Sequence, residues 1–516
     1  MKRFLILLLI LSLTIPCFLF SCQNSGIGSE GTSSSTTNSD QTPPSNVDND
    51  PDDTEESYNS VTNIPENLNY GGEKEVNIIC SGRTIYGDEI SVEMTNGDPI
   101  NDAIYQRNLN VETTLGVKII SHPIAVNNDW TANFDCINKV KTEMNGGAYN
   151  YDIMYSPSYA CVFRTSDGLW EDLLSVPHLD LSREYWSNLY SEQVEIGNRQ
   201  YFATGPIVLS LQRMIFATVF NKTLTEQHNI ENLYEVVKEG RWTIEYQSKI
   251  VANAYSEMDS IEGYTDGDFY GFVTNTNVST DPYWTIWDIS VLSRTDDGYF
   301  TYDFKIEEAT NFVNTVMKFY WENPGVHLYL PEGDNVDQDK IRSHFADGRA
   351  IMAQIMLQQL EHEEMRTMSD PYGIIPLPKF EENDLPYYSA AYDSFTCVSI
   401  LRGQSSIDLE MCGAVLELMA CESYNVVQPA YYEIALKGKY SKDEESWEML
   451  DNMMKNFRVD QDFLYSTTDT TDILQDFRNA IATQNKSFST LMKNKDDRTK
   501  RMVEFIIKKV RDMHGD

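Results

Sequence analysis

One short segment combines residue types that could recognise a sugar. Residues 281–287, Asp-Pro-Tyr-Trp-Thr-Ile-Trp, place an acid and three aromatic rings within seven positions. A carboxylate accepts hydrogen bonds from neighbouring sugar hydroxyls, and a flat ring covers the C–H face of a pyranose. Trp284 and Trp287 are also spaced i, i+3, which is the spacing of rings that pack on one face of a helix. The segment therefore predicts either a carbohydrate contact or a part of the core.

Motifs for covalent, nucleotide or zinc chemistry do not occur in the sequence. There is no G-x-S-x-G, no G-x-x-x-x-G-K-[ST] and no H-E-x-x-H. The seven histidines are scattered, and Asp334, Asp337 and Asp339 lack the glycine and final glutamate of a calcium loop. We expect a protein without catalytic residues, without a metal and without a cofactor. A glycoside hydrolase, which needs two convergent carboxylates, stays open as an alternative.

Composition limits the class of protein. The chain has 516 residues, of which 41% are hydrophobic, and this is enough for a large core and more than one domain. It carries 40 basic and 79 acidic residues, a net charge of −39. Such a charge repels phosphate and anionic headgroups. Nucleic-acid binding, and attachment to a membrane through charge, are therefore excluded.

The N-terminus has the features of an export signal. Lys2 and Arg3 precede an apolar run, 4–20, and Ser21-Cys22 follows it. A small residue and a cysteine at this place resemble the lipobox of bacterial lipoproteins, which predicts a signal peptide over 1–21 and a lipidated Cys22. Residues 22–66 are rich in Ser, Thr, Asn and Asp, and we expect a disordered tether there. The alternative is an ordinary signal peptide with a chance cysteine.

The body of the chain alternates strand-like and helix-like segments. Apolar β-rich runs at 76–80, 117–120 and 151–155 are separated by helical patterns at 100–115 and 134–144. This β-α-β-α-β order predicts a parallel sheet covered by helices. Further along, 344–362 is predicted to be helical. The interpretation is two α/β lobes with helical additions.

From residue 101 onward, the order of several motifs resembles bacterial extracellular solute-binding proteins of ABC importers, family 1, the carbohydrate-type family. The resemblance covers most of the chain beyond the tether. It rests on Asp102-Ala103-Ile104-Tyr105-Gln106-Arg107-Asn108, Gly168-Leu169-Trp170-Glu171-Asp172-Leu173, Gly240-Arg241-Trp242-Thr243, Phe345-Ala346-Asp347-Gly348-Arg349-Ala350-Ile351-Met352, Tyr372-Gly373-Ile374-Ile375-Pro376-Leu377-Pro378-Lys379 and Pro429-Ala430-Tyr431-Tyr432.

This resemblance implies an α/β fold of two lobes, the periplasmic-binding-protein-like fold of type II, with a hinge between the lobes. Lobe I would comprise 67–205 plus 392–428, and lobe II 206–391 plus 429–516. The chain would cross between the lobes near 205–212, 390–394 and 428–431.

The resemblance also implies ligand-binding residues. Asp281 and Tyr283 match an acid-Pro-Tyr motif of maltodextrin-binding relatives, in which the acid and the ring contact sugar. Gln212, beside Ser210, falls at the hinge, where those relatives place an acid; this difference argues against a maltodextrin ligand. Packing inside a lobe is the alternative for every predicted residue. The full set is Tyr155, Ser158, Tyr159, Gln212, Asp281, Tyr283, Trp284, Gln354, Gln358 and Asp393.

The function that follows is a lipid-anchored receptor on the outer face of the cytoplasmic membrane. We expect a monomer that delivers a sugar or oligosaccharide to an ABC permease and touches the membrane only through its lipid. A surface glycoside hydrolase, or a peptide or polyamine receptor on the same fold, remains an alternative, the latter because of the acidic composition.

Overall fold

The computed structural model of the protein describes residues 58–86, 88–124, 130–162, 164–330, 338–441, 443–460, 464–465 and 473–516. The predicted signal peptide, Cys22 and most of the predicted tether lie outside these residues. The end of the tether that is described contacts the folded body. The Tyr58 hydroxyl donates to Glu433 over 3.2 Å, and the Ser60 amide donates to the Asn425 side chain over 2.8 Å.

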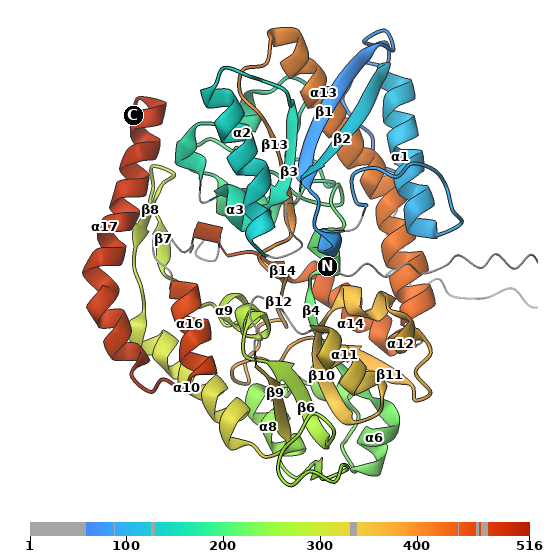
Figure 1. Ribbon diagram of the computed structural model, residues 1–516, viewed down its shortest axis with the longest axis vertical. Helices are drawn as coiled ribbons and strands as arrows, with labels where there is room; N and C mark the ends of the chain where they lie inside the picture. Colours follow the sequence, from blue (N-terminus) through green and yellow to red (C-terminus); the bar gives the residue numbers. More distant parts are fainter. Residues whose placement is uncertain are drawn as a thin grey trace, which may run out of the picture. The chain divides into compact units, whose positions relative to one another are not determined.

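A four-stranded sheet forms the centre of the first lobe (Figure 1). Its strand order is β13-β3-β1-β2, with β1 parallel to both β2 and β3, and with β13 antiparallel to β3. The parallel sheet predicted from the β-α-β-α-β order is therefore confirmed. The strands are β1 (Lys74–Ser81), β2 (Val117–Ile124), β3 (Ile153–Pro157) and β13 (Thr396–Ile400).

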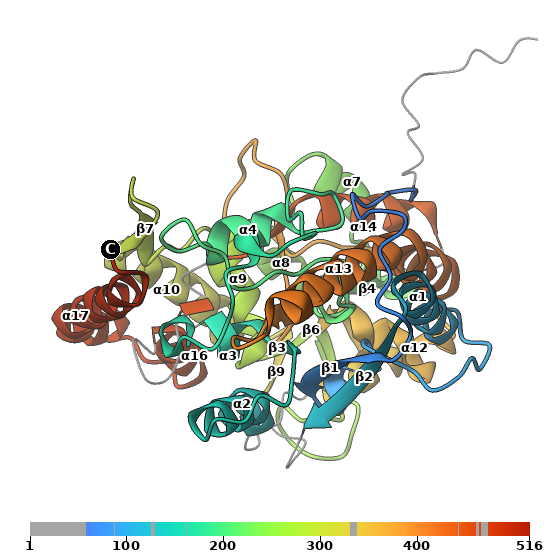
Figure 2. The same ribbon diagram turned by 90° about the horizontal axis from the view of Figure 1, so that it is seen from above.

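Helices cover both faces of this sheet. Helix α1 begins after Asp98, whose carboxylate accepts the Ile100 and Asn101 amides, and it ends at Gly116 in the left-handed region (φ 62°). In Figure 2, α13 and α2 lie on opposite sides of β3. The helical segments of this lobe are η1 (Thr84–Tyr86), α1 (Pro99–Leu115), η2 (Trp130–Phe134), α2 (Asp135–Asn145), α3 (Ser158–Val162), η3 (Thr165–Asp167), η4 (Leu173–Ser175), α4 (Asn188–Val194), α13 (Ser406–Glu422) and η7 (Ser423–Val427).

A six-stranded sheet forms the centre of the second lobe. Its order is β11-β4-β10-β6-β5, and β9 also pairs with β6. The central strand β10 (Ala350–Met356) corrects the predicted helix over 344–362. Helix α11 ends at Ala346, and all seven residues of β10 are buried. Because β10 is buried on both faces, its sequence is apolar except for Gln354 and does not alternate, so periodicity cannot distinguish it from a buried helix.

The other elements of this lobe surround the sheet. The strands are β4 (Phe216–Asn221), β5 (Tyr255–Ser256), β6 (Phe269–Asn275), β9 (Val326–Tyr329) and β11 (Tyr372–Ile375). The helical segments are α6 (Lys222–Gln227), α7 (Leu233–Lys238), α8 (Ile244–Val251), η5 (Val278–Thr280), α9 (Asp281–Ile286), α10 (Ile306–Glu322), α11 (Gln338–Ala346), η6 (Leu357–Glu361), α12 (Glu363–Arg366), η8 (Ala430–Tyr440) and α14 (Glu444–Lys455).

Two connecting segments run side by side where the chain passes between the sheets. The chain leaves the first sheet after β3, passes through α5 (Ser210–Arg213) and enters the second at β4; it returns between β11 and β13. Ala203 pairs with Val398 and Ile215 with Ala391. The Ser210 hydroxyl accepts the Thr396 amide over 3.0 Å. The predicted crossings at 205–212 and 390–394 lie in these stretches; the lobe boundaries stay a prediction.

The C-terminal helices α16 (Ile473–Ala482) and α17 (Phe488–His514) complete the described chain. Helix α17 packs against α10, α16 and the hairpin of β7 (Leu292–Arg294) and β8 (Phe300–Tyr302), as Figure 1 shows. Its last turn is held by an ion pair between Arg511 and Asp297, and by a hydrogen bond of 2.6 Å between Tyr201 and His514. A short pair of strands, β12 (Ser389–Ala390) and β14 (Phe457–Arg458), lies beside the second crossing.

Candidate functional site

Helix α9 places a carboxylate in the interior of the protein. Asp281 is its first residue, and Pro282 follows with a backbone angle that already suits a helix start. The Asp281 side chain is fully buried and accepts two hydrogen bonds from Arg478 of α16, one of them 2.7 Å from Nε. This is the two-pronged arrangement in which guanidinium and carboxylate bind most strongly.

The same guanidinium reaches a second acid. Nη2 of Arg478 lies 3.4 Å from Asp393, in the segment between β12 and β13. Burial raises the pKa of both carboxyls, that of Asp281 to about 7, although Arg478 acts in the opposite direction. Arg478 therefore joins α9, α16 and the second crossing segment through one buried charge.

A second polar group gathers around Asn133, which is fully buried in η2. Its side-chain oxygen accepts from Arg83 Nη1 and from the Tyr86 hydroxyl, each over 2.9 Å, and its Nδ2 donates to the Tyr159 hydroxyl over 2.9 Å. Arg83 and Tyr86 follow strand β1, and Tyr159 follows β3. All three therefore lie beyond the carboxyl ends of parallel strands, where open α/β sheets bind ligands.

The two polar groups lie within electrostatic reach of each other. The charge of Asp393 helps to raise the pKa of the Tyr159 hydroxyl, and Arg83 helps to lower the pKa of Asp393 against the larger effect of burial. We call the combined set the polar cluster. Its members are Arg83, Tyr86, Asn133, Tyr159, Asp281, Asp393 and Arg478.

Two buried donors near this region have no hydrogen-bond partner among the described residues. They are Nε of Arg83 and Nε1 of Trp284. Trp284 lies three residues after Asp281, and its ring meets Phe477, the neighbour of Arg478, edge to face at 5.2 Å. Buried donors without a partner also occur elsewhere in the described chain, at Arg164, Trp170 and Gln247. The two near the polar cluster are available to an acceptor from outside the chain.

The structure brings three of the predicted ligand-binding residues into the polar cluster: Tyr159, Asp281 and Asp393. Four others lie fully buried with partners inside the fold: Tyr155, Ser158, Tyr283 and Gln354. Ser158, for example, shares a hydrogen bond of 2.7 Å with Tyr190. Gln212 and Gln358 are half-buried. These contacts explain all four buried residues as parts of the interior, and their contact with a ligand stays a prediction.

Four members of the cluster are not among the residues predicted from the sequence: Arg83, Tyr86, Asn133 and Arg478. Arg478 had a signal, because it is a single cation within a helix whose neighbours Phe477 and Ile481 are buried. No pattern in the sequence indicated Arg83 or Asn133. Both lie in short segments outside the strands and α-helices, and only the packing around the sheet brings these segments together.

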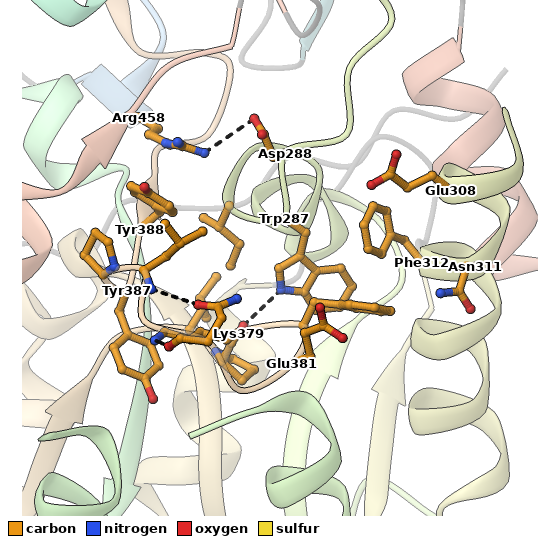
Figure 3. Close-up of a pocket in the computed structure, with 17 residues that line it drawn as sticks. Trp287, Asp288, Glu308, Asn311, Phe312, Lys379, Glu381, Tyr387, Tyr388 and Arg458 are labelled. Carbon is orange, nitrogen blue, oxygen red and sulfur yellow. Dashed lines mark hydrogen bonds and ion pairs between the residues drawn. The ribbon is translucent and has the colours of Figure 1, made fainter. Parts of the chain in front are cut away.

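A separate pocket opens at the other end of α9, with a volume of about 370 Å³ (Figure 3). The Trp287 ring lies against Tyr283, with centroids 4.6 Å apart, and its indole N–H donates to the Pro378 carbonyl over 3.1 Å. At the rim Arg458 covers the Tyr388 ring at 3.4 Å and pairs with Asp288 at 3.5 Å. Trp287, Asp288 and Arg458 at this pocket thus already have partners, whereas Nε of Arg83 in the polar cluster has none among the described residues. We therefore place the candidate site at the cluster.

The described residues were also considered for metal ligands, reactive cysteines and membrane-spanning helices, and they contain none of these. No group of three or more His, Cys, Asp or Glu residues there is arranged to hold a metal ion. The six cysteines in that part of the chain are buried and unpaired. Among the same residues no helix is both long and apolar enough to cross a membrane.

Solved structures show what class of fold this is. In three of them, at least 98% of the solved chain aligns with this protein. Apo RafE of Streptococcus pneumoniae is 12% identical over 84% of this chain, with a TM-score of 0.50. The GacH receptor of Streptomyces glaucescens is 13% identical over 85%, with a TM-score of 0.50. The galacto-N-biose-/lacto-N-biose I-binding protein of an ABC transporter of Bifidobacterium longum is 12% identical over 82%, also with a TM-score of 0.50.

The chain thus has the two-lobed α/β fold of periplasmic binding proteins, as the resemblance implied. No protein-family model matches the chain, and no curated protein matches it. At such low identity the likeness establishes the fold alone.

Proposed function

We propose that the protein is an extracellular receptor that binds a sugar or oligosaccharide between its lobes and delivers it to an ABC permease. The observation that carries this proposal is the polar cluster. Its residues come from the carboxyl ends of the first sheet, from α9 of the second lobe and from the second crossing segment. A solute that contacts members from both lobes would hold the two lobes together.

The mechanism requires no covalent step. A ligand that bridges both lobes stabilises the closed arrangement more than the open one and so shifts the equilibrium between them. The side-by-side crossing segments absorb the rotation, while the two sheets stay rigid. A permease that recognises the closed arrangement would then receive loaded receptors selectively.

The test is thermal unfolding of the purified protein against neutral and acidic sugars, oligosaccharides, peptides and polyamines. A ligand at about 100 times its dissociation constant adds roughly 2.7 kcal/mol to the free energy of unfolding, which raises the melting temperature measurably. We expect a shift with a sugar, and the sugar recovered intact. A shift with a peptide or polyamine alone would contradict the sugar ligand, and turnover of the sugar would contradict the receptor.

Two asparagines provide matched variants for this test. Asn133→Ala removes the centre of the polar cluster, and we expect it to abolish the shift. Asn311→Ala, at the rim of the pocket in Figure 3, should leave the shift unchanged. The reverse result would move the binding site to that pocket.

Attachment to the membrane forms a separate part of the proposal. Cys22 would carry the lipid, and the polar segment after it would hold the folded body away from the surface. Labelled palmitate supplied to producing cells should appear in the protein, and Cys22→Ser should release it from the membrane fraction. Retention of the label by the serine variant would contradict lipidation at this position.

A further inference from the structure

We propose, on the basis of the receptor function above, that the solute is an acidic sugar whose carboxylate binds Arg83. The observation behind this inference is the state of the Arg83 side chain. Arg83 is 8% exposed, and among the described residues its guanidinium makes one hydrogen bond, from Nη1 to the neutral amide of Asn133. Its Nε is buried without a partner, and no described carboxylate lies within ion-pair distance of it.

The other deeply buried arginines are satisfied differently. Arg342, 7% exposed, pairs with Glu364 and Asp339. Arg107, 1% exposed, donates to the backbone carbonyls of Glu89 and Ile90. A buried cation normally has such partners, because the loss of water is otherwise uncompensated. Arg83 lacks such partners and lies in the candidate site; Arg164 also has a buried Nε without a partner, but this residue is only half-buried and lies outside the polar cluster.

The free part of this guanidinium fits a carboxylate. Asn133 occupies Nη1, and neither Nε nor Nη2 donates to a described residue. These two nitrogens form one edge of the planar group, and a carboxylate binds to such an edge with two parallel hydrogen bonds. A neutral hydroxyl would accept one bond and leave the charge uncompensated.

The charges around Arg83 favour a ligand with one negative charge over a ligand with two. Asp281 and Asp393 lie in the same cluster and are already shared by Arg478. A phosphate dianion would be repelled by these acids and by the net charge of the protein, −39. The single charge of a uronic acid carboxylate meets the single free edge of Arg83, and the hydroxyls of the sugar are left for the tyrosines and amide of the cluster.

The test compares two ligands that differ in one charge. Calorimetry of the full purified chain would measure binding of disaccharides that carry one galacturonate or one glucuronate, each against its uncharged methyl ester. We expect the acid to bind at least tenfold more tightly than its ester. Arg83→Gln should remove this preference, whereas Arg164→Gln should keep it. Arg164 is a matched control because its Nη1 also bonds to an asparagine, Asn138, and its Nε also lacks a partner, but it is not a member of the polar cluster.

The outcomes separate this inference from the receptor function. Binding of the esters or of neutral sugars, but not of the acids, would overturn the acidic sugar and leave a sugar receptor. Preference for the acid that survives Arg83→Gln would overturn the role of Arg83. Binding of no sugar at all would overturn both.

A second measurement does not depend on the choice of sugar. If Arg83 is an uncompensated charge kept for a ligand, Arg83→Met in the ligand-free protein should leave the melting temperature unchanged or raise it. A clear decrease, of the kind expected for Arg342→Met, would show that Arg83 holds the fold together and would overturn the inference.

Discussion

Two Asp–Arg pairs lie at opposite ends of helix α9, and they differ in burial. At its start, Asp281 is fully buried against Arg478, whose side chain is 15% exposed. Just beyond its end, the Asp288 side chain is 84% exposed and pairs with Arg458 over 3.5 Å. The first pair connects helices that are far apart in the sequence, while the second closes the rim of an open pocket. The comparison shows that the pocket at the end of α9 is not the place where the buried polar groups converge.

The largest effect is expected from breaking the buried pair. Arg478→Met leaves the Asp281 carboxylate buried without a counter-charge, which should lower the free energy of unfolding by about 3–5 kcal/mol. Urea unfolding of the variant measures this. The double variant Arg478→Met with Asp281→Asn should recover part of the loss, because no charge then remains. A loss below about 1 kcal/mol would show that the pair is not buried in solution.

The pH dependence of stability should reflect the same pair. The pKa of Asp281 is about 7 in the folded protein and near 3.8 when unfolded, so the folded state binds more protons between these values. Its contribution to stability is therefore complete below about pH 4 and is lost as the pH rises through 7. Asp281→Asn should flatten the stability curve between about pH 4 and 7. Asp288→Asn is the control, and an unchanged curve in Asp281→Asn would contradict the prediction.

A smaller effect is expected at the centre of the cluster. Tyr159→Phe removes the acceptor of Asn133 Nδ2, and a buried donor left without a partner costs about 1–3 kcal/mol. Tyr86→Phe should cost less, because the Asn133 oxygen still accepts from Arg83. Thermal unfolding of both variants tests this order. Equal losses of stability in the two variants would contradict the central role of the Asn133 side chain in the cluster.

The smallest effect is expected at the exposed pair. Arg458→Gln removes an ion pair in contact with solvent and a contact with the Tyr388 ring, which together should amount to about 1 kcal/mol or less. Sugar binding should not change. A large loss of affinity in this variant would assign the pocket of Figure 3 to the binding site and reverse the comparison.

The local pattern of apolar residues in the sequence was sufficient to predict part of the fold. The β-α-β-α-β order of the first lobe is visible in strand-like runs separated by helical spacing, and Gly116 ends α1 where the sequence indicates. Strand β10 was mistaken for a helix, because a run that is buried on both faces has no period to read. For the site, the sequence predicts Asp281, Tyr159 and Asp393, but not Arg83, Tyr86, Asn133 or Arg478.

The sequence by itself determined the class of secondary structure, the acidic charge that excludes nucleic acids, and the presence of an acid and rings at 281–287. Only the tertiary structure decided which of these groups meet. Arg478 lies 197 residues from Asp281 and 85 from Asp393. Contacts over such separations depend on how the sheets and C-terminal helices pack, and side chains in irregular segments carry no periodicity that reveals their partners. That packing, rather than any motif, leaves Arg83 buried with an unused edge.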